Sequence, residues 1–112
     1  QYVKDYVAYY KTERGYHPRS VNANNGWAAT ASGSLMNMRL FEYVPEIRSA
    51  VLLVHGEEAH SLMYSQDAYK LLQGDNKELM LIPGAAHTDL YDQMEIIPFD
   101  KLETFFNNAF TQ

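Results

Sequence analysis

The side chains of this sequence that could carry out chemistry are its histidines and the acidic residues near them. His87 ends the segment Pro-Gly-Ala-Ala-His at 83–87, while His55 immediately precedes a glycine and the pair Glu57 and Glu58. An imidazole can both accept and donate a proton at neutral pH because its unperturbed pKa lies near neutrality. His87 is therefore a candidate for proton transfer. The alternative is a loop histidine that only hydrogen-bonds nearby backbone.

A metal site is a second possible use of these residues. His55, His60 and His87, together with Glu57 and Glu58, are all potential ligands. However, the sequence has no H-x-x-x-H or H-E-x-x-H spacing, and His55 ends an apolar run where a structural histidine is the commoner outcome. It also has no Gly-rich phosphate loop. We expect no metal, no nucleotide and no other cofactor.

Two apolar segments must position His55 and His87. Residues 51–56 read Val-Leu-Leu-Val-His-Gly, and residues 79–82 read Leu-Met-Leu-Ile just before the Pro-Gly loop. An unbroken apolar run ended by Gly is typical of a parallel strand covered on both faces. Open α/β sheets place their chemistry beyond the carboxyl ends of such strands. A strand-helix-strand unit here should be a right-handed parallel crossover.

The remaining segments are predicted to be helices and loops. Before the first strand, the pattern predicts an amphipathic, Tyr-rich helix over 2–10, an irregular loop over 20–33 that contains Trp27, and a short helix capped by Ser34 that runs to residue 41. Between the strands it predicts a helix capped by Ser65, with Asp67 in its first turn and Gly74 after its end. After the second strand it predicts a loop over 88–92 and a Phe-rich helix from Pro98 to 110.

Composition limits the classes of protein and partner. The chain has 112 residues, of which 46% are apolar and 21% charged, which indicates one globular domain at most. Its net charge of -5, without a Lys/Arg cluster, argues against nucleic acid or an anionic membrane as partner. No apolar run approaches the roughly 20 residues that a membrane span needs. The absence of cysteine excludes disulfides and thiol chemistry.

The order of these motifs resembles the C-terminal part of an α/β-hydrolase. The resemblance rests on a strand ending in His-Gly, an acidic loop, a helix, a second strand, the Pro-Gly-x-x-His segment and a terminal amphipathic helix. Residues 51–58 and 81–92 are similar to the dienelactone-hydrolase-like branch. The match covers residues 50–110 well and the first half loosely. It implies a single partial domain, with 1–49 preceding the penultimate strand and 50–112 holding the last two strands and terminal helices.

The resemblance assigns residues to a catalytic triad. His87 falls on the family's general base, which takes a proton from the nucleophile and returns it to the leaving group. The family's acid usually stands three residues after the glycine that ends the strand, and here that residue is Ala59. Glu57 or Glu58 could substitute, although both could instead form a solvated acidic turn. The acid could also follow an earlier strand that this chain lacks.

The nucleophile of the family is missing. The sequence contains no G-x-S-x-G, and Ser32-Gly33-Ser34 lacks the flanking glycines that the strained elbow needs. The chain also begins with Gln1 rather than Met. We therefore expect a fragment of an esterase-like serine hydrolase, inactive alone, whose complete form acts on a small-molecule substrate of the ester type, with the size and class of the ester left open. Only Tyr16, His17, Trp27 and the Asn-rich loop hint at substrate choice.

Two strands alone would leave apolar faces and strand edges uncovered. We expect the missing N-terminal part of the enzyme, or a second copy in a homo-oligomer, to complete the sheet. The alternative function is a non-enzymatic assembly module that uses the Tyr-rich first helix and the Phe-rich last helix as contact surfaces.

Overall fold

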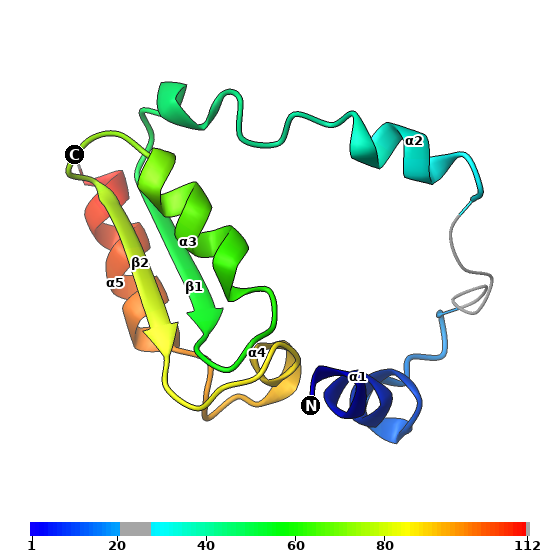
Figure 1. Ribbon diagram of the computed structural model, residues 1–112. Helices are drawn as coiled ribbons and strands as arrows, with labels where there is room; N and C mark the ends of the chain where they lie inside the picture. The colour runs from blue at the N-terminus through cyan, green and yellow to red at the C-terminus, as the bar shows by residue number, and fades with distance from the viewer. Residues whose placement is uncertain (21–27, 112) are drawn as a thin grey trace.

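The computed structural model describes residues 1–20 and 28–111, which form a two-stranded sheet and several helices (Figure 1). In chain order the elements are α1 Tyr2–Tyr10, the 3-10 helix η1 Glu13–Gly15, α2 Ala31–Met36, the 3-10 helix η2 Val44–Glu46, β1 Val51–Gly56, α3 Leu62–Leu71, β2 Lys77–Ile82, α4 Asp89–Asp92 and α5 Phe99–Phe110.

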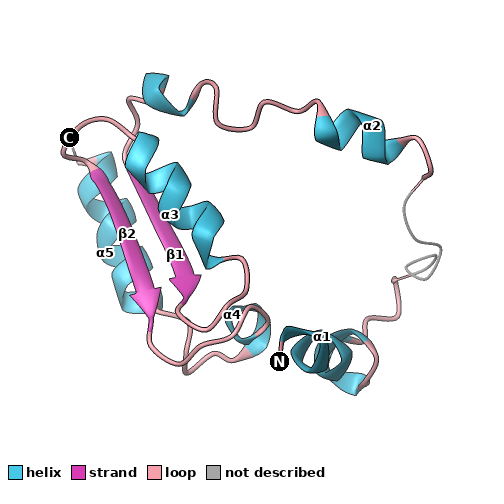
Figure 2. Ribbon diagram, viewed as in Figure 1, coloured by secondary structure: helices cyan, strands magenta, loops and turns pink. Residues whose placement is uncertain are grey.

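The two strands are parallel, which confirms the predicted α/β arrangement. They pair in register from Val51 opposite Lys77 to Gly56 opposite Ile82. Helix α3 connects them across one face of the sheet and α5 lies against the other face, so the crossover is right-handed (Figure 2). The carboxyl ends of both strands therefore meet at one edge, and the loops that follow them lie side by side.

The strands are less buried than the sequence predicted. Val51 to His55 are only half-buried, because β1 has a described partner on one side alone and the helices cover only part of each face. Among the described residues, the fully buried apolar side chains are those of Ala59, Ile82 and Ala85. All three lie at the carboxyl end of the sheet, so this end is the best packed part of the fold.

The segment before the sheet differs from its prediction. Ser34 lies inside α2 and does not cap it, because the helix already begins at Ala31, within the expected loop. The helix ends at Met36, not at residue 41. Asn37 closes it through a side-chain hydrogen bond from Nδ2 to the carbonyl of Gly33, at 2.8 Å. Residues 21–27 of the predicted loop, with Trp27, lie outside the described residues.

Helix α3 begins earlier than predicted. It starts at Leu62, so Ser65 is an internal residue, and its hydroxyl bonds the ring of His55. Asp67 is beyond the first turn and instead pairs with Lys70 at 2.9 Å. The prediction of Ser65 as a cap was wrong, because a serine inside a helix can also satisfy a partner on a neighbouring strand. Gly74, with a φ of 97°, lies in the turn to β2 and not at the helix end.

The last part of the chain follows its pattern with two changes. Residues 89–92, predicted as loop, form the single helical turn α4, and Pro98 stands just before α5, not as its first residue. Phe99, Phe106 and Phe110 on α5 are 48%, 51% and 83% exposed. The wide aromatic face expected of this helix is therefore present but only partly covered.

Candidate active site

His87 lies in the loop between β2 and α4, at the carboxyl edge of the sheet. Gly84 gives this loop its turn, with a φ of 69° that other residues rarely adopt. The amide of Glu58 donates to the carbonyl of Ala85 at 3.0 Å, and the amide of Glu57 donates to that of Ile82 at 3.0 Å. The loops after the two strands are thus joined, and they hold His87 beside the end of β1.

The close approach of these loops explains the glycine that ends β1. A Cβ placed on Gly56 would collide with the carbonyl of Ala85 and crowd that of Ala86. The glycine therefore allows the loop that contains His87 to lie directly against the strand end.

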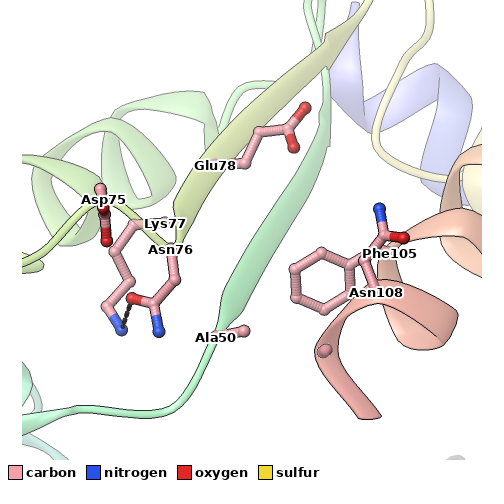
Figure 3. Close-up of a pocket in the computed structure, with 8 residues that line it drawn as sticks. Ala50, Asp75, Asn76, Lys77, Glu78, Phe105 and Asn108 are labelled. Atoms are coloured by element: carbon pink, nitrogen blue, oxygen red, sulfur yellow. Dashed lines mark hydrogen bonds between the residues drawn. The ribbon is translucent and has the colours of Figure 1, made fainter. Parts of the chain in front are cut away.

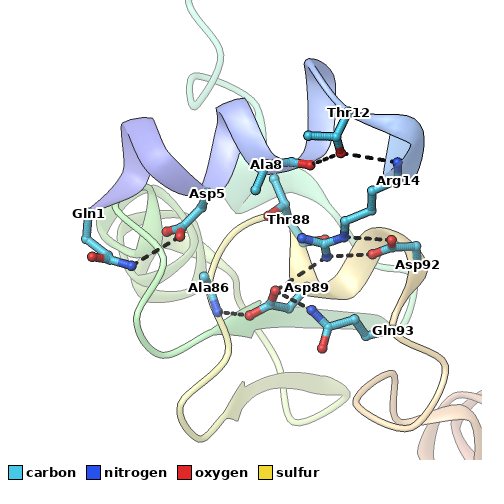
Figure 4. Close-up of polar contacts among 10 residues, drawn as sticks. All are labelled: Gln1, Asp5, Ala8, Thr12, Arg14, Ala86, Thr88, Asp89, Asp92 and Gln93. Atoms are coloured by element: carbon cyan, nitrogen blue, oxygen red, sulfur yellow. Dashed lines mark hydrogen bonds and ion pairs between the residues drawn. The ribbon is translucent and has the colours of Figure 1, made fainter. Parts of the chain in front are cut away.

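A polar network fixes the other side of the His87 loop (Figure 4). Asp89 accepts hydrogen bonds from the amide of Ala86 at 2.8 Å and from Nε2 of Gln93 at 2.6 Å. Arg14 donates to both carboxylate oxygens of Asp92 at 2.6 and 2.8 Å, and to the carbonyl of Thr88 at 3.1 Å. Asp89 therefore satisfies the backbone and a side chain of its own segment, and Arg14 connects this segment to the residues that follow α1.

This network changes the ionisation of its members. The bond from Arg14 lowers the pKa of Asp92, and the same bond raises the pKa of Arg14. Both groups are consequently charged at neutral pH, and they connect the segment after α1 to the helical turn that follows His87.

Four side chains form a continuous hydrogen-bonded series inside the site. Ser65 Oγ lies 2.7 Å from Nδ1 of His55, whose Nε2 lies 3.1 Å from Ser61 Oγ. Ser61 Oγ in turn lies 2.8 Å from Nδ1 of His87. Both ring nitrogens of His55 are engaged, which agrees with its expected structural role. His87 has only Nδ1 engaged within the described part of the chain, which leaves Nε2 for another group.

Aromatic rings surround His87. The centroid of its ring lies 5.4 Å from that of Tyr6, 5.3 Å from that of His60 and 5.6 Å from that of Tyr91. Burial first, and then the nearby His60, lower the pKa of His87. Burial likewise lowers the pKa of His55, with contributions from His87 and His60. Both rings are therefore neutral at neutral pH, the state that a proton acceptor requires.

The phenols above the site are also affected by their surroundings. Burial, followed by the hydrogen bond with Tyr10, raises the pKa of Tyr91 to about 12. Burial and Tyr10 also raise the pKa of Tyr6. These tyrosines stay protonated at all physiological pH values, so they cover the ring of His87 without adding charge.

The structure does not bring the predicted acids to His87. Glu57 and Glu58 are exposed, and in the portion of the chain with described coordinates neither carboxylate bonds the imidazole. Ala59, at the family's usual acid position, is buried with 7% exposure. Ser61, two residues further along, provides the oxygen that faces Nδ1. A role for either glutamate as triad acid stays a prediction.

Hollows lie at both ends of the sheet. One, of about 200 Å³, opens beside His87 and is lined by Val54, His55, Ala59, Leu90 and Tyr91 among others. Figure 3 shows a second, of about 160 Å³, between the first residues of the strands and the end of α5, where Phe105, Asn108 and Ala109 line it. Only the first contains a group suited to proton transfer at neutral pH.

Within residues 1–20 and 28–111, no group of three or more His, Asp or Glu side chains has a geometry that could hold a metal ion. No helix in those ranges combines the length and apolarity of a membrane span. Tyr16 and His17, named as hints of substrate choice, are exposed, whereas Trp27 lies outside the described residues.

Ser61, Ser65 and Arg14 were not predicted as residues of the site, and Ser65 was predicted only as a helix cap. Ser61 immediately precedes α3 and Ser65 lies one turn further along. This spacing of four residues at the start of a helix that packs on β1 was the available signal. Arg14 gave no local signal, because its partner Asp92 is 78 residues away.

This chain is similar to a longer protein from Pseudomonas aeruginosa. No protein-family model matches the sequence. It is 48% identical over 108 residues to a Pseudomonas aeruginosa protein named uncharacterized protein PA2218, an alignment that covers 96% of this chain and 29% of the relative. The crystal structure of hypothetical protein PA2218 superposes with a TM-score of 0.87 at 47% identity, covering 97% of this chain and 34% of that one. The chain thus spans about a third of the length of its relative.

Proposed function

We propose that this chain is the C-terminal part of an α/β-hydrolase of the dienelactone-hydrolase-like type, and that it supplies the general base, His87, for ester hydrolysis. The observation that carries the proposal is the setting of His87. It lies beyond the carboxyl ends of two parallel strands, with Nδ1 held by Ser61 at 2.8 Å and Nε2 unengaged by described residues, beside a hollow of about 200 Å³. This is the presentation that a triad histidine needs.

The chemistry follows from that presentation. His87 Nε2 accepts the proton of a nucleophilic hydroxyl while the oxygen of that hydroxyl bonds to the acyl carbon of the ester. The imidazolium then gives this proton to the departing alkoxide, which leaves as the alcohol. A water molecule next loses a proton to the same nitrogen and attacks the acyl-enzyme, and the proton returns to the nucleophile as the acid is released.

The nucleophilic hydroxyl must come from outside this chain. Ser32 and Ser34 both lie within helix α2 and are exposed, so neither occupies a turn between a strand and a helix. The chain covers 29% of its longer relative, which leaves ample polypeptide for earlier strands and an elbow. Alone, the 112-residue chain is expected to be inactive.

The surface of the chain supports completion by more polypeptide. Its accessible area is 8787 Å², whereas a compact monomer of this size exposes roughly 6,300 Å². Its radius of gyration is 16.7 Å, against about 13 Å for a compact domain of this length. The preceding part of a longer protein would pair with the sheet and cover this excess, and a second copy is the other possible partner.

The test is hydrolysis of a small aryl ester by the full-length protein. Replacing His87 with Ala should lower kcat/KM by about 10²- to 10⁴-fold, the usual contribution of a general base. Arg39→Ala is the control, because the exposed Arg39 pairs with Glu42, a contact outside the site. A fluorophosphonate probe should label the wild-type protein. Unchanged turnover in His87→Ala would remove this residue from the mechanism.

A second candidate function is a non-enzymatic assembly module. It is favoured by the apolar side chains that α1 and α5 expose. On α1, Tyr2, Val3, Val7 and Tyr10 are each more than half exposed, and on α5 Phe110 is 83% exposed. Under this hypothesis the full-length protein shows neither ester turnover nor probe labelling, and substitutions on these helices change its assembly alone.

A further inference from the structure

The hydrogen-bonded series of Ser61, His55 and Ser65 lies on the side of His87 where the acid of a catalytic triad would bind the imidazole. In a triad, one ring nitrogen faces the nucleophile and the other donates its proton to a carboxylate that fixes the tautomer. Here Nδ1 of His87 faces Ser61 Oγ at 2.8 Å, and this hydroxyl is also 3.1 Å from Nε2 of His55. No carboxylate within the described residues contacts the ring.

We infer that Ser61, backed by His55 and Ser65, is the positioning residue that holds His87 in its catalytic tautomer in place of a carboxylate. The inference rests on the proposed function of His87 as a base. It assigns to this chain a neutral relay of serine, histidine and serine, which orients the imidazole by hydrogen bonds and not by charge.

The hydrogen-bond capacities of the four groups allow two orders in which Ser61 accepts from one imidazole and donates to the other. A hydroxyl can donate one proton, and a neutral imidazole has one donor and one acceptor nitrogen. In the first order, His87 Nδ1–H donates to Ser61, Ser61 donates to Nε2 of His55, and His55 Nδ1–H donates to Ser65. In the reverse order every bond is inverted, and the proton of His87 sits on Nε2. Only the first order leaves Nε2 free to accept a proton.

The surroundings of the series favour a neutral relay. The pKa values of His55 and His87 are both lowered, mainly by burial. The nearby Tyr6 and Tyr91 have raised pKa values and remain uncharged. A buried carboxylate at the position of Ala59, which is 7% exposed, would need a partner of its own. A hydroxyl at Ser61 satisfies Nδ1 without that cost.

The tautomer of His87 can be measured directly. Long-range proton–nitrogen correlation spectra of the full-length protein, labelled with ¹⁵N-histidine, report which ring nitrogen carries the proton. We expect the Nδ1–H form in the wild type and a shift toward the Nε2–H form in Ser61→Ala. Ser61→Thr, which keeps the hydroxyl, and Ser61→Asp, which places a carboxylate near Nδ1, should both restore the Nδ1–H form, and Ser61→Asp should also raise the pKa of His87.

Kinetics on a small aryl ester give the second readout. Ser61→Ala should lower kcat about 10- to 100-fold with little change in KM, the scale of one lost hydrogen bond at a buried site. Ser61→Thr should recover it. Ser34→Ala is the control, because Ser34 is exposed on α2. A wild-type tautomer retained in Ser61→Ala, or a shifted tautomer with unchanged kcat, overturns the inference. Absence of turnover in the wild type defeats the proposed function instead, and the spectra still decide whether Ser61 orients His87.

Discussion

The guanidinium of Arg14 donates two hydrogen bonds, of 2.6 and 2.8 Å, to the carboxylate of Asp92, which is 78 residues away in the sequence. Arg14 follows α1 and Asp92 ends α4, so this ion pair connects the first helical segment to the loop that contains His87. The third bond of Arg14, to the carbonyl of Thr88 at 3.1 Å, reaches the residue adjacent to the histidine. The aromatic cover of the site therefore depends on an ion pair.

Arg14→Ala should release this cover. Because the pKa of Asp92 is lowered in the folded protein, the pair adds stability above the ordinary carboxylate pKa, and this stability is lost as pH falls through the lowered value. The amides of α1 should exchange with deuterium faster in the variant at pH 7, and the difference from wild type should vanish in acid. Arg39→Ala, which breaks only an exposed pair with Glu42, is the control. Equal effects of the two substitutions would contradict the prediction.

The two half-buried imidazoles, His55 and His87, should make stability depend on pH. Their pKa values are lowered on folding, so the unfolded chain binds more protons just below its ordinary histidine pKa of about 6.5. The unfolding temperature should consequently fall as pH is lowered from 6.5 toward the lowered values. A series of thermal melts checks this. The slope should diminish in His55→Gln and persist in Arg39→Ala, and a profile that is flat between pH 7 and 5 would refute it.

Gly56→Ala should lower the free energy of unfolding, because it disturbs the backbone beside His87. The added Cβ meets the carbonyl of Ala85, so the loop must move or the strand must bend, at a cost of about 1–3 kcal/mol. Gly33→Ala is a matched control, because no atom of the described residues lies within 4 Å of a Cβ there. In helix α2 that change should be neutral or stabilising by about 0.5–1 kcal/mol. Urea unfolding of the two variants measures the difference, and similar midpoints would argue against the close approach.

The candidate acids can be separated from the serine relay by charge removal. Glu57→Gln and Glu58→Gln should leave kcat/KM on an aryl ester near the wild-type value, because both carboxylates are exposed and neither bonds His87 in the described structure. A loss beyond about tenfold in one variant would make that glutamate the acid, since positioned proton-transfer partners contribute at least that much.

The isolated 112-residue chain should associate. With its excess of exposed apolar surface, it is expected to form oligomers or to bind the preceding part of a longer protein. Size-exclusion chromatography with light scattering distinguishes these outcomes from a monomer. Phe110→Ser and Phe106→Ser, both on the uncovered side of α5, should reduce the association. A stable and cooperatively folded monomer would show that the chain needs no partner.

The local features of the sequence predicted much of the secondary structure. The apolar run that ends at Gly56, the Pro-Gly turn before His87 and the helical spacing of Tyr2, Tyr6 and Tyr10 each correspond to observed elements. Each of these features depends on residues that are close together in the sequence, so the local sequence is sufficient to predict it. The helix limits at Ser34 and Ser65 were mispredicted, because a serine stabilises a helix start or bonds elsewhere according to what lies nearby.

The sequence by itself determined the parallel crossover and the place of His87 at its carboxyl edge. Runs and repeats of apolar residues, with periods of two in strands and 3.6 in helices, predict the secondary structure. The right-handed twist of strands of L-amino acids then favours a right-handed crossover between them. Only the tertiary structure decided that Ser61, not a glutamate, faces His87, and that Arg14 holds the loop beyond it. Those contacts join residues 26 and 78 positions apart. Their formation depends on the packing of α3 and α1 around the sheet, which no local pattern specifies.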